Sequence, residues 1–134
     1  MAGKSTRTRR CSRQDAAQRH DQAKAFAEVA ELDPLSADGP TRSAAVSNAV
    51  LSGIAAADAI CCRRLGRHSV GDDHQQALTL LEDAGDVGRA ARGHLATLLS
   101  IKNKAHYEGD DPSVAEAKRA IRAMRSILEL AATA

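Results

Sequence analysis

Aromatic side chains are nearly missing from this sequence of 134 residues, which contains one phenylalanine, one tyrosine and no tryptophan. Because aromatic and β-branched cross-strand pairs stabilise sheets, this scarcity disfavours a β-sandwich or a β-barrel. It also disfavours RNA recognition by base stacking on an aromatic sheet surface. The apolar residues are mainly alanine, leucine, isoleucine and valine. We therefore expect an all-α fold of closely packed helices, since alanine and leucine are strong helix formers.

Cysteine is scarce too, and the three residues are Cys11, Cys61 and Cys62. Cys61 and Cys62 are adjacent in a predicted helix, where neighbouring side chains diverge by about 100°. This number and spacing fit no disulfide framework and predict a reducing, cytoplasmic environment. Although His68 and His74 follow the cysteines, the sequence lacks the Cys-x-x-Cys and His-Glu-x-x-His spacings typical of zinc sites. We therefore expect no metal and no cofactor.

A purely apolar run long enough to cross a bilayer is also lacking. The longest apolar stretch, residues 44–62, contains Ser47, Asn48, Ser52 and Asp58. An aspartate near the centre of a membrane helix costs about 2.5–3.5 kcal/mol, and alanine offsets little of this cost. We therefore expect a buried helix of a soluble protein and no membrane partner.

The charge is distributed unevenly between the two ends of the chain. Residues 1–13 contain five cations and no acid, while the whole chain has a formal net charge of +2, so residues 14–134 carry −3. A short basic segment without an apolar stretch is typical of a disordered, solvated leader. We expect residues 1–14 to form such a tail and residues 15–134 to form one domain.

Helical periodicity is the strongest pattern that the sequence does contain. Apolar residues recur at spacings of three and four between turn residues, which predicts helices at about 15–31, 41–65, 74–84, 87–107 and 114–131. No segment predicts a strand. Short connections between long amphipathic helices predict an antiparallel bundle of four to five helices.

Three polar residues, Asp58, Lys102 and His106, fall inside or beside the apolar stripes of two predicted helices. Inward charges are costly unless paired, so we expect the three side chains to form one polar cluster between the helices. As a site, Lys102 would hold a phosphate, His106 would move a proton, and Asp58 would orient one of them. As a structural feature, Lys102 would either extend its ammonium group to solvent or pair with Asp58, and His106 would cap its helix end.

Further polar residues are candidates for contacts with nucleic acid. Asn103, Lys104 and Tyr107 flank the Lys102 and His106 positions, and Arg63 and Arg67 lie at the end of the long predicted helix. The two arginines would form an anion-binding corner. The alternative is a solvated helix end, where cations interact favourably with the helix dipole.

The segment from Ser47 to Tyr107 resembles the HEPN superfamily of small helical domains. The first matching signature is a long helix that opens with Ser47-Asn48-Ala49 and continues through the alanine-rich residues 55–59, with Gly66 after it and His74 at the start of the next helix. A second signature is a leucine-rich helix with a polar end, found here as Leu98-Leu99 and residues 102–107, followed by a final helix at 114–131.

This resemblance implies two kinds of function. Many HEPN proteins are metal-independent ribonucleases, including toxins paired with nucleotidyltransferase-type antitoxins, and their arginine and histidine act across a homodimer groove. Others are non-catalytic proteins that bind nucleotides or RNA. Carried over by position, Lys102 stands for the arginine and His106 for the histidine or for the acid of an alternative motif. Lysine lacks the bidentate grip of arginine, and the gap between the two residues is one shorter than the catalytic spacing.

Overall fold

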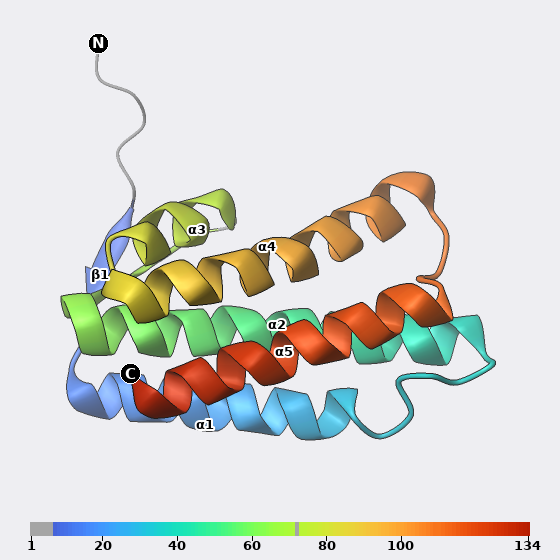
Figure 1. Cartoon of the computed structure of the whole chain (residues 1–134), viewed down its shortest axis with the longest axis horizontal. Helices are drawn as coiled ribbons and strands as arrows, with labels where there is room; N and C mark the ends of the chain where they lie inside the picture. The colour runs from blue at the N-terminus through green and yellow to red at the C-terminus, as the bar shows by residue number, and fades with distance from the viewer. Residues whose placement is uncertain (1–6, 72) are drawn as a thin grey trace, which may run out of the picture.

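A computed structural model of the protein describes residues 7–71 and 73–134 (Figure 1). The described residues form five helices: α1 (Arg13–Ala30), α2 (Gly39–Leu65), α3 (Gln75–Glu82), α4 (Gly85–Glu108) and α5 (Val114–Thr133). Two short strands, β1 (Thr8–Arg10) and β2 (Arg67–Ser69), pair in antiparallel fashion. The predicted helical bundle is confirmed, and its five helices lie close to the predicted segments.

The four long helices alternate in direction along the chain, and α2 lies at the centre of the bundle (Figure 1). α2 contacts every other helix, whereas α3 packs mainly on α4 and reaches the small sheet. Alanines line much of the buried surface, so neighbouring helices approach closely around a few larger side chains. The largest fully buried apolar residues are Ile60, Leu81, Leu95, Leu98, Met124 and Ile127.

Local capping explains where several helices begin and end. Ser113 and Glu116 form a capping box at the start of α5, in which each side chain accepts a hydrogen bond from the other residue's backbone N–H. Gly66 and Gly109 follow α2 and α4 in the left-handed conformation, which glycine adopts without a steric penalty. These local features define the start of α5 and the ends of α2 and α4.

α2 is long and apolar enough to cross a membrane by length and composition alone. However, 78% of the window that meets this criterion is buried inside the molecule. The surrounding helices cover the surface that lipid would need to contact. The apolar character of α2 is thus explained by its place in the core, as the aspartate in its sequence predicts.

The predictions for the beginning of the chain need correction. Residues 8–10, expected in a disordered tail, form β1, and Thr8, Arg9 and Arg10 pair with Ser69, His68 and Arg67 of β2. Of the rest of the expected tail, Arg7 precedes β1, residues 11–14 continue into α1, and residues 1–6 lie outside the described residues. The expectation of no strand is wrong for the same segment. Charge alone predicted disorder, whereas contacts with a distant part of the chain order this segment.

Gly88 allows the close approach of α4 to the end of α3. A Cβ atom at this position would overlap the backbone carbonyl of Leu81 and the side chain of Ala84. Because a backbone atom cannot rotate away, we expect Gly88→Ala to lower the free energy of unfolding by about 1–3 kcal/mol. Urea denaturation followed by circular dichroism measures this loss.

Gly93 provides the matched control on the same helix. A Cβ atom there would meet nothing within 4 Å. We expect Gly93→Ala to stabilise the protein by about 0.5–1 kcal/mol, since alanine loses less backbone entropy in a helix. Equal effects of the two substitutions would contradict this account of the α3–α4 contact.

Candidate functional site

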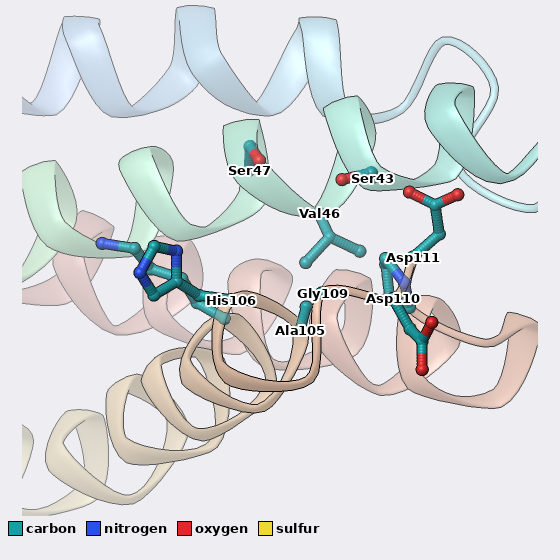
Figure 2. A pocket seen from close by; sticks show the side chains of 10 residues that line it. Ser43, Val46, Ser47, Ala105, His106, Gly109, Asp110 and Asp111 are labelled. Atoms are coloured by element: carbon teal, nitrogen blue, oxygen red, sulfur yellow. The ribbon is translucent and has the colours of Figure 1, made fainter.

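Lys102 and His106 lie on adjacent turns near the end of α4 and line the same pocket, which has a volume of about 400 Å³ (Figure 2). The pocket is bounded by the end of α4, the following loop and the first turns of α2. Its lining residues are Ser43, Val46, Ser47, Lys102, Ala105, His106, Gly109, Asp110, Asp111 and Pro112. Lys102 and His106, which are four residues apart in the sequence, therefore face the same pocket in the folded protein.

The two ends of this pocket differ in chemistry. His106 lies at one end, Asp110 and Asp111 lie at the other, and Val46 is between them (Figure 2). Ser43 and Ser47 add hydroxyl groups from α2, which can donate or accept hydrogen bonds. The pocket can thus offer a cation, an imidazole and hydroxyls to a polar ligand.

The expected inward orientation of Lys102 and His106 is wrong. Both residues are exposed, and the buried side of this part of α4 is formed by Leu98, Leu99 and Ile101. Within residues 7–71 and 73–134, neither side chain makes a hydrogen bond or an ion pair. Among these residues nothing occupies the polar groups of Lys102 and His106, and neither side chain forms the predicted core ion pair or helix cap.

The residues that flank Lys102 and His106 differ in how available they are to a ligand. Asn103 is exposed, and Tyr107 is 93% exposed, the most exposed of the large apolar side chains in the described part of the chain. Lys104 Nζ, in contrast, donates to Glu116 Oε2 at 3.0 Å, and this bond raises the pKa of Lys104. Lys102 and Asn103 also line a second hollow of about 220 Å³ beside the start of α3. Lys102 therefore lies between two hollows.

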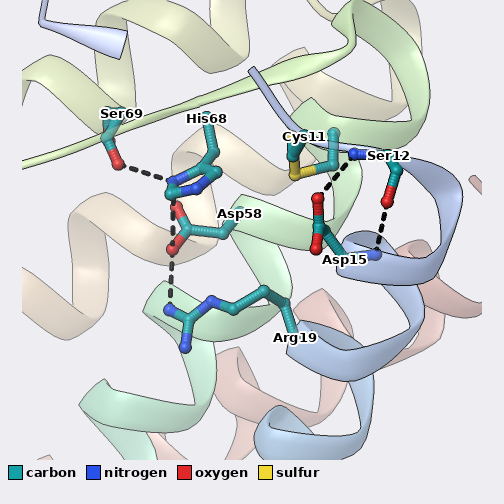
Figure 3. Close-up of a disulfide and its surroundings, with 8 residues drawn as sticks. Cys11, Ser12, Asp15, Arg19, Asp58, His68 and Ser69 are labelled. Carbon is teal, nitrogen blue, oxygen red and sulfur yellow. Dashed lines mark hydrogen bonds and ion pairs between the residues drawn. A yellow bond between two sulfur atoms is a disulfide. The ribbon is translucent and has the colours of Figure 1, made fainter. Parts of the chain in front are cut away.

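Asp58 is buried, as its place in the apolar stripe predicts, with 8% of its surface exposed. Its partners are nevertheless not the predicted ones. Arg19 of α1 donates to Asp58 Oδ2 at 2.7 Å, and Nδ1 of His68 lies 3.9 Å from the same oxygen (Figure 3). Burial raises the pKa of Asp58, and the hydrogen bond and charge of Arg19 oppose that rise.

The predicted cluster of Asp58 with Lys102 and His106 is therefore wrong. Ser47, which lines the Lys102 pocket, is separated from Asp58 by three turns of α2, or about 16 Å along the helix axis. The sequence did contain a signal for the true partner. Arg19 falls between Ala16 and Ala23, at a position where the buried stripe of α1 continues.

The two arginines expected to form an anion-binding corner have different environments. Arg63 is half-buried, and its guanidinium donates to the carbonyl of Ala131 and lies 3.1 Å from Nδ1 of His20. It therefore connects α2 to the end of α5. Burial and the charge of Arg63 lower the pKa of His20. Arg67 is exposed on β2 and remains available to an anion.

The expectation that the cysteines form no disulfide is wrong. Cys11, just after β1, is bonded to Cys62 near the end of α2 (Figure 3). Cys61 points into the core as a free thiol, and burial raises its pKa to about 12. Adjacent helical positions thus diverge as expected, but the partner of Cys62 is 51 residues away in sequence. The inference of a reducing compartment from the cysteine pattern loses its basis.

The structure separates two polar sites that the sequence predicted as one. Lys102 and His106 share a pocket at the end of α4, and Asp58 belongs to a cluster with Arg19 and His68 beside the disulfide. The resemblance to HEPN proteins depends on residues of both sites and stays a prediction. Comparisons with protein-family models, with curated proteins and with solved structures find no significant match for this chain.

Proposed function

We propose that this chain is a HEPN-like, RNA-associated protein and that the pocket of Lys102 and His106 is a metal-independent ribonuclease site of the toxin or defence type. The observation that supports this function is a cation and an imidazole, both exposed, that line the same pocket from adjacent turns of α4. Lys102 has no ion-pair partner among residues 7–71 and 73–134. Its ammonium group can therefore bind a phosphate as a point charge.

In the proposed reaction, the ribose 2′-oxygen attacks the adjacent phosphorus and the bond to the 5′-oxygen breaks. The products are a 2′,3′-cyclic phosphate and a 5′-hydroxyl. His106 either removes the proton from the 2′-hydroxyl or donates a proton to the leaving 5′-oxygen. Lys102 stabilises the additional negative charge on the pentavalent phosphate. Asp58 has no part in this step, because it lies in the other polar site.

The proposal includes a homodimer. One imidazole can perform only one of the two proton transfers, and a second copy related by a twofold axis would bring the partner's His106 to the same groove. Leu51 is 45% exposed and lies one turn beyond Ser47 on the face of α2 that lines the pocket. Together with Tyr107, it offers apolar surface for such an interface.

Cleavage of mixed-sequence RNA by the purified full chain in the presence of a chelator tests this function. We expect fragments with 2′,3′-cyclic phosphate ends on a denaturing gel. His106→Ala should slow cleavage by about 100-fold or more, because general acid–base catalysis contributes at least that factor. Lys102→Ala should have an effect of similar size, because a charge-stabilising group is lost.

Two matched variants control for the general loss of an imidazole or an ammonium group. His94→Ala and Lys24→Ala remove the same groups at positions outside the pocket, so both should cleave at the wild-type rate. Equal cleavage by wild type and His106→Ala, or no cleavage by the wild type, would contradict a ribonuclease function.

The alternative function is a non-catalytic helical module that binds a nucleotide, a nucleic acid or a protein. It is favoured by Asp110 and Asp111, whose carboxylates line the same pocket and would oppose the additional negative charge of a pentavalent phosphate, so they disfavour cleavage more than binding. It is also favoured by His106, which no hydrogen bond orients within the described residues. For this module we expect RNA or nucleotide binding without cleavage, weakened by salt and by Lys102→Ala. A nucleotidyltransferase-type antitoxin is the partner expected for the toxin function. Co-purification of the two proteins would support the toxin function over the non-catalytic module.

A further inference from the structure

Two cysteines and a histidine meet at the end of the bundle opposite the Lys102 pocket, where β1, β2 and the end of α2 converge (Figures 1 and 3). The Sγ atoms of Cys11 and Cys62 and a ring nitrogen of His68 all lie within 4.8 Å of one another. Cys62 is buried, and Cys11 and His68 are half-buried. An ion in solvent could thus reach a site that is partly enclosed.

Backbone contacts bring these three residues together independently of the sulfur–sulfur bond. Arg9 of β1 pairs with His68 of β2, and the N–H of Cys11 donates to the carbonyl of Gly66 at 3.0 Å. The N–H of Val70 donates to the carbonyl of Arg7, also at 3.0 Å. We therefore expect both thiols and the imidazole to remain close together after the disulfide is reduced.

The hydrogen bonding of His68 suits a metal ligand. Nδ1 lies 2.8 Å from the carbonyl oxygen of Ser69, which can only accept, so the proton is on Nδ1 (Figure 3). In the neutral ring this leaves a lone pair on Nε2. Metal-bound histidines usually donate their other N–H to a carbonyl or carboxylate, and the carboxylate of Asp58 is also near, 3.9 Å from Nδ1.

We propose that the reduced protein binds one zinc ion through the thiolates of Cys11 and Cys62 and the imidazole of His68. Thiolate and imidazole are the ligands that zinc prefers, and a solvent molecule would complete a tetrahedral site. Ligand atoms in such a site are about 3.6–3.8 Å apart, which small movements of the three side chains can reach. The missing Cys-x-x-Cys spacing does not argue against this site, because its ligands come from three separate segments.

The site and the disulfide are alternative states of the same two sulfur atoms. A low-molecular-weight dithiol supplies two electrons and two protons to the Cys11–Cys62 bond and becomes a disulfide itself. Zinc then displaces the two thiol protons into solvent. In the reverse direction, a low-molecular-weight disulfide accepts two electrons from the thiolates, the Cys11–Cys62 bond forms and zinc is released. A reducing compartment, such as a cytoplasm, would favour the reduced state.

Metal titration of the full chain tests the proposal. The protein is reduced with a phosphine, freed of reductant without oxygen, and titrated with Co²⁺ and then Zn²⁺. We expect one equivalent of cobalt to give a thiolate-to-cobalt charge-transfer band, which zinc abolishes. Because even second-shell changes weaken metal binding by about 10–100-fold, Cys11→Ser and His68→Gln should each weaken zinc binding by about 100-fold or more. Oxidised wild type should show no such band.

Cys61→Ala and His94→Gln are the matched controls, since they alter a thiol and an imidazole outside the cluster and should leave zinc affinity unchanged. Circular dichroism establishes whether each variant is folded. Zinc should raise the melting temperature of the reduced wild type and leave that of reduced His68→Gln unchanged. If the reduced wild type unfolds, we expect zinc to restore its helicity. Failure of the reduced wild type to bind one equivalent, or equal loss of affinity in the controls, would overturn the proposal.

Discussion

Replacing Cys11 with serine is expected to lower the free energy of unfolding of the oxidised protein by about 4 kcal/mol. The disulfide joins residues 51 apart in sequence, and a cross-link that closes a loop of this length removes about that much conformational free energy from the unfolded chain. The bond also attaches β1 to the central helix. Urea denaturation in the presence of a chelator, which removes any contribution of bound metal, measures the change.

Reduction provides the internal control for this prediction. With excess reductant, wild type and Cys11→Ser should unfold at nearly the same urea concentration, because the cross-link is absent from both. Cys11 is a better choice than Cys62 for this test, since Cys62 is buried and serine there would also leave a hydroxyl in an apolar environment. Equal stability of the two oxidised proteins would show that the bond does not constrain the unfolded chain.

Replacing Arg19 with methionine is expected to cost about 2–3 kcal/mol at neutral pH. The substitution leaves the carboxylate of Asp58 buried without the guanidinium that donates to it at 2.7 Å. Removing one partner of a fully buried pair costs about 3–5 kcal/mol, and we expect less here because the Arg19 side chain is 30% exposed. The double variant Arg19→Met/Asp58→Ala should recover part of the loss, because it leaves no unpaired charge.

The pH dependence of this loss identifies its cause. Burial raises the pKa of Asp58, and without Arg19 the pKa should rise further. A carboxyl with a raised pKa binds its proton more readily in the folded state, so its effect on stability becomes less favourable as pH rises through the folded-state value. The loss in Arg19→Met should therefore be largest near neutral pH and smaller in acid.

Chemical denaturation of Arg19→Met at several pH values tests this trend. Arg89→Met is the matched control, because Arg89 pairs with Asp86 through exposed side chains and its replacement should cost less than about 0.5 kcal/mol. If the loss of unfolding free energy in Arg19→Met does not depend on pH, its cause is lost packing of the arginine side chain and not the buried charge of Asp58.

The helices were predictable because their signals are local. The three-and-four spacing of apolar residues, the capping box of Ser113 and Glu116, and the terminal glycines Gly66 and Gly109 all act within a few residues of the helix they define. The inward position of Asp58 follows from the same periodicity. The exposure of Lys102 and His106 does not follow from it, because near the end of α4 exposure depends on which neighbouring elements cover the helix.

The sequence by itself determined the helical-bundle architecture, the approximate helix bounds and the burial of Asp58, since these depend on the chemistry of neighbouring residues. Only the tertiary structure decided that Arg19 pairs with Asp58, that Cys11 bonds to Cys62, and that β1 pairs with β2. Each of these contacts joins segments far apart in sequence, and the choice of partner depends on how the helices pack. The same packing put Lys102 and His106 in one pocket and Asp58 in another site.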